Sequence, residues 1–181
     1  VAFSWAYCQA LEGLSGTVPP ARALHLRAIC LELERLQNHL GDLGALGNDA
    51  GFAFGLAQFS RLKEALLRAM HAAIGQRYLL DAVVPGGTAF DLQDSAGATL
   101  GTAVHGIGES VLELRRIYDE HAGVRDRFVG AGQVTPELAR RLGLTGLAGR
   151  ASNVAVDLRT DRPCAPYDVL HPVKCVQQSG D

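Results

Sequence analysis

The feature that constrains the fold most is a regular spacing of apolar residues between positions 26 and 43. Apolar side chains recur there every three or four residues, which predicts one apolar stripe on a helix about twenty-five residues long. The stripe consists of Leu26, Ile29, Cys30, Leu33, Leu36, Leu40 and Leu43. Because such a helix is stabilised mainly by burying its stripe, we expect other helices to pack against it.

Two later stretches, residues 56–74 and 100–117, repeat the same spacing. A glycine-rich cluster, residues 44–51, separates the first two helices and predicts a turn, so that they form a hairpin. The third stripe is close to the heptad spacing of antiparallel bundles. Residues 1–12 also keep a helical spacing, with no N-cap before them, so we expect the sequence to begin inside a longer protein.

Beyond residue 130 the patterns are shorter. Thr135 and Pro136 predict a short helix with the threonine as its N-cap. Residues 153–158 alternate weakly and residues 169–176 are rich in β-branched side chains, which predicts loops with one or two short strands. The expected fold class is mainly α: a single domain, residues 1–181, with long antiparallel helices and a small β/loop segment near the C-terminus.

The composition is that of an ordinary globular domain and excludes several classes of protein. The 181 residues include 17 Lys and Arg against 19 Asp and Glu, a formal charge of −2. The chain therefore lacks the basic excess of nucleic-acid-binding proteins. No apolar stretch is long enough to span a bilayer, and the first residues lack the basic start of a signal peptide. These features predict a cytoplasmic chain that binds no nucleic acid.

The four cysteines, Cys8, Cys30, Cys164 and Cys175, lack the C-x-x-C spacing and the nearby histidines of metal sites. We expect reduced, mostly buried thiols and no metal bound by this chain alone. The sequence also lacks the motifs of serine hydrolases, P-loop NTPases and zinc proteases. Its two G-x-G pairs lack the third glycine of a dinucleotide-binding loop, which argues against such a site within this chain.

One face of the first long helix is polar. Glu32, Arg35, His39 and Asp42 step by three and four residues, and Arg22 is placed to join them from the first turn. One interpretation is a solvated charged face. The other is a buried ion network beside a functional site, where desolvation would shift the pKa of His39. The sequence alone does not separate these interpretations.

Two other polar features also have an ordinary interpretation. Asp49 precedes Gly51 in the predicted turn, where an aspartate often only accepts a backbone N–H. A second series lies in the loop-rich last third, where Arg–carboxylate pairs can hold an ordered loop. It consists of Arg150, Ser152, Asp157, Arg159 and Tyr167.

Short motifs run through nearly the whole sequence in one order. They are Arg22-Ala23 with Arg27, Glu32-Leu33-Glu34-Arg35, His39-Leu40, Asp49-x-Gly51, Gly75-x-Arg77, Pro85-Gly86-Gly87, Asp91-Leu92, Gly143-Leu144-Thr145-Gly146, Arg150-Ala151-Ser152, Asp157-Leu158-Arg159, Tyr167 and Gly180-Asp181. This series resembles the large subunit of nickel-iron hydrogenases and its relative, the 49 kDa quinone-site subunit of respiratory complex I. The agreement of many motifs in one order makes the resemblance specific.

The resemblance implies a helical bundle within a larger redox complex, peripheral to the inner face of the cell membrane, with an iron-sulfur subunit among its partners. It implies a quinone or a nickel-iron centre in the full protein, and NADH dehydrogenase chemistry for the whole assembly. The family's cysteine motifs would fall around the first residues and beyond Asp181. We therefore expect a middle fragment that holds no metal or cofactor and is inactive by itself.

The resemblance also suggests roles for individual residues. Asp49 matches the aspartate that, in the complex I relatives, accepts a hydrogen bond from the quinone-facing histidine, so we expect Asp49 to be catalytic. Arg35 and His39 are expected beside the quinone site. The remaining polar residues are expected to form a structural network. These are Arg22, Glu32, Arg150, Asp157, Arg159 and Tyr167.

Several positions depart from the family pattern. Phe3 stands where the family usually has a histidine, Asn153 replaces a glycine, and Cys164 replaces a tyrosine. These departures favour a divergent hydrogenase-like paralogue, such as a formate hydrogenlyase large subunit. The alternative is a noncatalytic scaffold that keeps the fold for assembly and has lost its metal and quinone chemistry.

Overall fold

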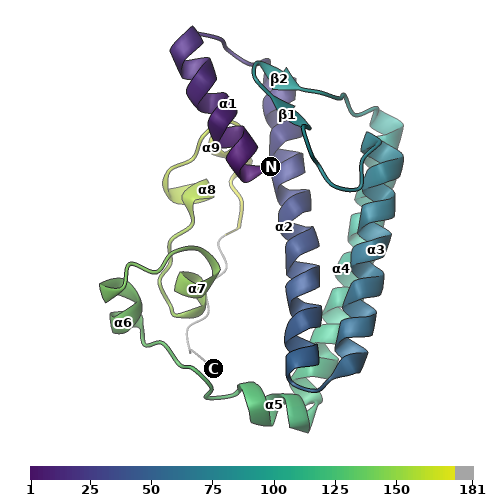
Figure 1. Cartoon of the computed structure of the whole chain (residues 1–181), viewed down its shortest axis with the longest axis vertical. Helices are drawn as coiled ribbons and strands as arrows, with labels where there is room; N and C mark the ends of the chain where they lie inside the picture. The colour runs from purple at the N-terminus through teal and green to yellow at the C-terminus, as the bar shows by residue number, and fades with distance from the viewer. Residues whose placement is uncertain (174–181) are drawn as a thin grey trace. The chain divides into compact units, whose positions relative to one another are not determined.

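The computed structural model describes residues 1–173 and divides the chain into two compact units, Val1–Arg125 and Asp126–Asp181. Each unit is described by itself (Figure 1). The chain as a whole is mostly helical and has only two short strands, which confirms the expected mainly α class. The expectation of a single domain stays a prediction.

The first unit is built on three long helices. In chain order its elements are α1 (Ala2–Ser15), α2 (Ala21–Asp49), α3 (Ala53–Ile74), β1 (Val83–Val84), β2 (Gly87–Thr88) and α4 (Asp94–Glu120). Helix α3 packs against both α2 and α4, while α1 contacts β1 and α2 contacts β2 (Figure 1). The predicted hairpin of two long helices and the third long helix are thereby confirmed.

The core of this unit lies where the three predicted stripes meet. Its buried residues are Cys30, Leu33, Leu40, Phe59, Leu62, Leu66, Leu67, Met70, Leu79, Ala82, Leu100, Ile107 and Leu114. Two members of the α2 stripe, Ile29 and Leu43, lie at its edge and are each 37% exposed. The 3.6-residue period was therefore sufficient to identify the side of each helix that is buried.

The glycine cluster does not form the turn as predicted, because α2 continues as a helix to Asp49. Gly44 and Gly47 lie within the helix and are buried. A Cβ at Gly44 would lie 3.2 Å from the Cβ of Phe59, so the glycine permits α3 to approach α2 closely. The turn itself is only residues 50–52, where Gly51 has a φ of 74°. The prediction was wrong because a glycine that serves close packing has the same sequence signal as one that ends a helix.

The predicted strands near the C-terminus are not found in the part of the chain that the structure describes. Residues 153–157 are irregular, and Val169 and Leu170 belong to the short helix α9 (Tyr167–Leu170); residues 174–176 lie outside the described part. The observed strands are β1 and β2, joined through Pro85 and Gly86 and paired Val83 with Thr88 and Val84 with Gly87. A strand forms only where a partner satisfies its backbone groups, and a weak alternation does not identify one.

The remaining helices are short. They are α5 (Ala122–Phe128), which crosses the boundary between the units, α6 (Pro136–Arg141), α7 (Gly146–Ala151), α8 (Leu158–Asp161) and α9. The Oγ1 of Thr135 accepts a hydrogen bond from the N–H of Leu138 at 3.2 Å, so the predicted N-cap of α6 is confirmed. Across residues 1–173, every helix is too short or too polar to traverse a lipid bilayer.

Candidate functional site

Asp49 is the last residue of α2 and is exposed. The backbone closes the following turn without its side chain: the N–H of Ala50 donates to the carbonyl of Leu46, and the N–H of Gly51 donates to the carbonyl of Asn48. Within residues 1–173 the Asp49 carboxylate accepts no hydrogen bond and forms no ion pair. The side chain of Asp49 therefore does not cap this turn, contrary to the ordinary interpretation of an aspartate at this place. Its oxygens are available to a group from outside the described residues.

Aromatic rings fix the backbone around Asp49. The ring of Phe52, which ends the turn, lies 5.3 Å from the ring of Tyr118 and 4.5 Å from that of His121. The ring of Phe59 lies 5.6 Å from that of Tyr118 on another side. Edge-to-face arrangements of this kind add to the hydrophobic gain of burying the rings. The end of α4 is thus attached to the turn between α2 and α3, which we call the hairpin tip (residues 47–55).

The polar face of α2 is only partly buried. Arg35 donates to both oxygens of the Glu32 carboxylate, at 3.2 and 2.9 Å, and these side chains remain 30% and 42% exposed. His39 is half-buried and Asp42 is exposed. Such an i,i+3 pair contributes little to stability in water. Among residues 1–173 the exposure of these side chains favours the solvated charged face over the buried ion network.

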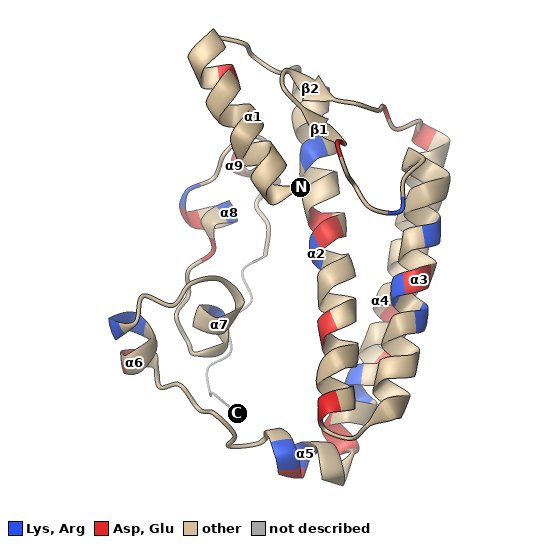
Figure 2. Ribbon diagram, viewed as in Figure 1, with Lys and Arg blue, Asp and Glu red and all other residues tan. Residues whose placement is uncertain are grey.

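A buried ion pair lies where α1, α2 and the β-hairpin meet. Arg27 is fully buried and donates to both oxygens of Glu12, at 3.1 and 2.5 Å. Arg27 also donates to the carbonyls of Val84 and Gly87, and the N–H of Gly86 donates to Glu12 at 2.8 Å. These hydrogen bonds, chiefly those from Arg27, lower the pKa of Glu12. Glu12 is the only Asp, Glu, Lys or Arg among residues 1–20, so the rest of α1 is drawn in tan (Figure 2).

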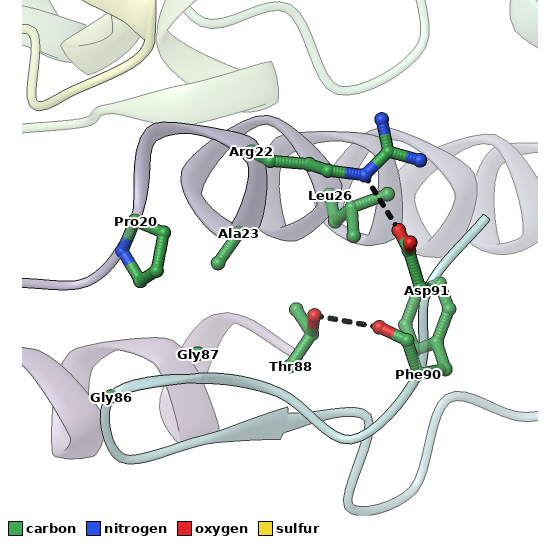
Figure 3. A pocket seen from close by; sticks show the side chains of 9 residues that line it. All are labelled: Pro20, Arg22, Ala23, Leu26, Gly86, Gly87, Thr88, Phe90 and Asp91. Carbon is green, nitrogen blue, oxygen red and sulfur yellow. Dashed lines mark hydrogen bonds and ion pairs between the residues drawn. The ribbon is translucent and has the colours of Figure 1, made fainter.

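Arg22 does not join the polar face of α2. Its Nε donates to Asp91 at 2.7 Å and its Nη2 to the carbonyl of Leu92 at 2.7 Å. The hydrogen bond from Arg22 lowers the pKa of Asp91. Both side chains line a shallow cavity of about 300 Å³ between the start of α2 and the β-hairpin (Figure 3). Because the arginine and the aspartate neutralise each other, the cavity presents no uncompensated charge to a ligand.

The polar series of the second unit centres on Asp157, which is buried. Asp157 accepts from the backbone N–H, the Nε and the Nη2 of Arg159, at 3.0, 3.1 and 2.7 Å. These bonds lower the pKa of Asp157 to about 2, and the charge of Arg150 contributes in the same direction. Tyr167 is buried at the start of α9. The expected pairing of an arginine with a carboxylate is thus present between Arg159 and Asp157. The same carboxylate is also the N-cap of α8, because it accepts from the backbone N–H of Arg159.

The described residues do not bring together a metal-binding group. Within residues 1–173 no three side chains of His, Cys, Asp and Glu are placed to hold an ion. Cys8 and Cys30 are buried as expected, whereas Cys164 is exposed, and Cys175 lies outside the described part. Burial raises the pKa of the Cys30 thiol to about 12, which disfavours the thiolate that metals require. The donor set of these residues therefore does not fit a nickel-iron centre.

The comparison with protein families identifies the group to which this sequence belongs. The sequence profile of the family described as "Respiratory-chain NADH dehydrogenase, 49 Kd subunit" matches residues 49–181. The chain belongs to this family. The match begins at Asp49 and includes α3, α4 and the second unit. The resemblance drawn from the ordered motifs is thereby confirmed.

Two relatives are identical to this chain at about a third of the aligned positions. A subunit of the NADH-quinone oxidoreductase of Clostridium beijerinckii is 31% identical over 175 residues, which cover 97% of this chain and 47% of that protein. Formate hydrogenlyase subunit 5 of Escherichia coli is 32% identical over 179 residues, which cover 99% of this chain and 31% of that protein. The chain therefore spans less than half of the length of each of these two relatives.

A solved structure shares the fold. It is a chain of the membrane-bound sulfane sulfur reductase, an archaeal respiratory membrane complex, and it superimposes with a TM-score of 0.85. The superposition covers 94% of this chain and 46% of that chain, at 23% sequence identity. At this level of sequence identity the comparison shows that the two chains share a fold, and it shows nothing about function.

Sequence reasoning missed three polar residues that the structure singles out. Glu12 was counted only as part of a helical spacing, while Arg27 and Asp91 appeared in motifs without a role. Their partners lie 15 and 69 residues away along the chain, as Arg27 with Glu12 and Asp91 with Arg22. The available signal for Glu12 was a single charge in an otherwise uncharged helix, which predicts a partner of opposite charge if that position is buried.

Proposed function

We propose that this chain is part of the large subunit of a membrane-associated respiratory oxidoreductase, and that the hairpin tip contributes Asp49 to the wall of its quinone site. Membership of the 49 kDa family supports this proposal, as do relatives named as subunits of NADH-quinone oxidoreductase. A hydrogenase-type assembly is the second candidate, favoured by the similarity to formate hydrogenlyase subunit 5. Either assembly would work at the inner face of the cell membrane, with an iron-sulfur subunit as partner.

The observation that carries the proposal is the geometry of Asp49. Its carboxylate is exposed, its hydrogen-bonding capacity is unused by the described residues, and its backbone is fixed by aromatic packing. A carboxylate at a fixed position can orient a donor and stabilise its positive charge without reorganising when the reaction occurs.

Quinone reduction consumes two electrons and two protons and yields the quinol. In the proposed site the electrons come from an iron-sulfur cluster of the partner subunit. Asp49 accepts a charge-assisted hydrogen bond from a histidine outside this chain and thereby keeps that imidazole protonated. The histidine passes one proton to the reduced quinone and is then reprotonated from solvent, and the second proton of the quinol is also drawn from solvent.

The test is the substitution Asp49→Asn in the full assembly, which keeps the shape of the side chain and removes its charge. We expect quinone-linked turnover to fall by about 100-fold or more, the lower end of what general acid–base catalysis contributes, with an unchanged thermal midpoint. Asp42→Asn is the matched control, since Asp42 is an exposed aspartate two turns earlier on the same helix. Unchanged turnover of Asp49→Asn would exclude the proposed role. Absence of quinone and hydrogen turnover in the unmodified assembly would favour the noncatalytic scaffold.

A further inference from the structure

The Tyr118 hydroxyl lies between two glycines that face each other across the hairpin tip. Gly47 is in the last turns of α2 and Gly55 is in the first turn of α3, and both are buried. A Cβ at either position would overlap the Tyr118 hydroxyl oxygen. The two glycines therefore leave a space that this one oxygen atom fills.

The same hydroxyl makes a hydrogen bond that orients it. Tyr118 donates to the carbonyl of Leu43 in α2 at 2.9 Å. Burial raises the pKa of Tyr118, so the hydroxyl stays protonated and remains a donor at neutral pH. The ring is held edge-on by Phe52, at the end of the α2–α3 turn, and by Phe59 in α3. The hydroxyl thus contacts the helix before the turn and the helix after it.

From this arrangement we propose that Tyr118 is the positioning residue for Asp49. Tyr118 does not touch the carboxylate. It fixes the ends of α2 and α3, and Asp49 lies only two residues beyond Gly47. Two of the hydrogen bonds that hold the backbone of the tip run from the N–H of Gly51 to the carbonyl of Asn48 at 2.9 Å and from the N–H of Phe52 to the carbonyl of Gly47 at 2.7 Å. Removal of the hydroxyl leaves an unfilled space beside Gly47, and the tip then samples several positions.

This inference rests on the proposed role of Asp49 and deepens it. A displacement of about 1 Å at a group that orients a reactant can cost on the order of 100-fold in rate, even when the substitution is remote from the reaction. A purely structural tyrosine would lower stability and would affect turnover independently of Asp49.

The experiment uses the full assembly and compares Tyr118→Phe with Tyr78→Phe. Both substitutions remove one hydroxyl, but Tyr78 is exposed and its hydroxyl forms no hydrogen bond within the described residues. We expect Tyr118→Phe to lower kcat for quinone reduction by about 3- to 10-fold at unchanged KM, as a small misplacement of an orienting group predicts. We also expect faster hydrogen exchange at the amides of Gly51 and Phe52. Tyr78→Phe should change neither quantity.

The same substitution in the Asp49→Asn background decides between positioning and general support. If Tyr118 acts through Asp49, Tyr118→Phe causes no further loss in the residual kcat of Asp49→Asn, although exchange at the tip still rises. The inference would be overturned if Tyr118→Phe lowered kcat by the same factor in the unmodified and the Asp49→Asn proteins. It would also be overturned if Tyr118→Phe left both kcat and hydrogen exchange normal. Either result would leave the role of Asp49 intact. An Asp49→Asn protein with full turnover would instead refute the proposed function, and with it the inference.

Two alanine substitutions test the space itself. Gly47→Ala pushes the hydroxyl out of its position and should reproduce the kcat loss and the faster exchange of Tyr118→Phe. Gly101→Ala is the control, because Gly101 is a glycine of α4 at which an added Cβ would meet no other atom within 4 Å. A Gly47→Ala protein that folds with normal kcat and normal exchange would also overturn the inference.

Discussion

The guanidinium of Arg27 donates to both carboxylate oxygens of Glu12, and neither side chain is accessible to solvent beyond 7%. Both side chains make further hydrogen bonds with the backbone of the β-hairpin. Arg27 donates to the carbonyls of Val84 and Gly87, and Glu12 accepts from the N–H of Gly86. The ion pair therefore attaches α1 and the β-hairpin, formed by β1 and β2, to α2. A buried charge is tolerated there only because each polar atom has a partner.

We expect Glu12→Ala to destabilise the first unit by about 3–5 kcal/mol, because it leaves the buried Arg27 charge without its partner. The double variant Glu12→Ala/Arg27→Met should recover most of this loss, since it removes both charges and keeps apolar volume. Urea unfolding followed by circular dichroism measures both. Glu113→Ala is the control, because Glu113 pairs with Arg116 on the exposed surface of α4. A Glu12→Ala protein as stable as this control would contradict the proposed attachment.

Stability should fall in acid over a defined pH window. Hydrogen bonds from Arg77 and Arg68 lower the pKa of Glu64 from 4.5 to about 2, and the pKa of Glu12 is lowered by Arg27. A carboxyl group with a lower pKa in the folded state stabilises the fold fully above its unfolded pKa and loses that contribution as the pH falls toward the folded value. The thermal midpoint should therefore be constant from pH 7 to about 5 and decrease from there to about pH 2.

Glu64→Gln should make this decrease shallower, whereas Glu109→Gln, an exposed glutamate of α4, should leave it unchanged. Thermal scans of the three proteins at each pH provide the comparison. Parallel curves for the unmodified protein and Glu64→Gln would show that the ion pairs of Glu64 do not contribute to the acid transition.

Leu33→Asp should unfold the first unit. Leu33 is 6% exposed on the buried stripe of α2, so an aspartate there would be a buried charge with no partner. Leu112→Asp introduces the same charge at an exposed leucine of α4 and should leave the fold intact. Far-UV circular dichroism distinguishes the two results. A folded Leu33→Asp protein would show that the stripe does not face the core.

The purified 181-residue chain should contain no stoichiometric nickel, zinc or iron. Cys8 and Cys30 are buried thiols whose pKa values are raised by burial, and residues 1–173 hold no three ligands in one place. Elemental analysis by mass spectrometry tests this expectation. One equivalent of metal per chain that is lost in Cys8→Ser or Cys30→Ser would contradict it.

The sequence alone was sufficient to predict the three long helices, their buried sides and the cap at Thr135. These features depend on contacts between residues that are three or four positions apart, and the helical period records them directly. Membership of the 49 kDa family was also readable, because many short motifs occur in one order.

The tertiary structure decided the features that depend on residues far apart in the chain. Arg22 pairs with Asp91, 69 positions away, in place of the nearer charges of α2. Gly47 serves the approach of Tyr118 and does not end α2. The strands formed at β1 and β2, where a partner was available, and not in the weakly alternating segment after residue 153. No local pattern specifies which distant group will fill a space or satisfy a charge, since that choice is made by packing when the helices come together.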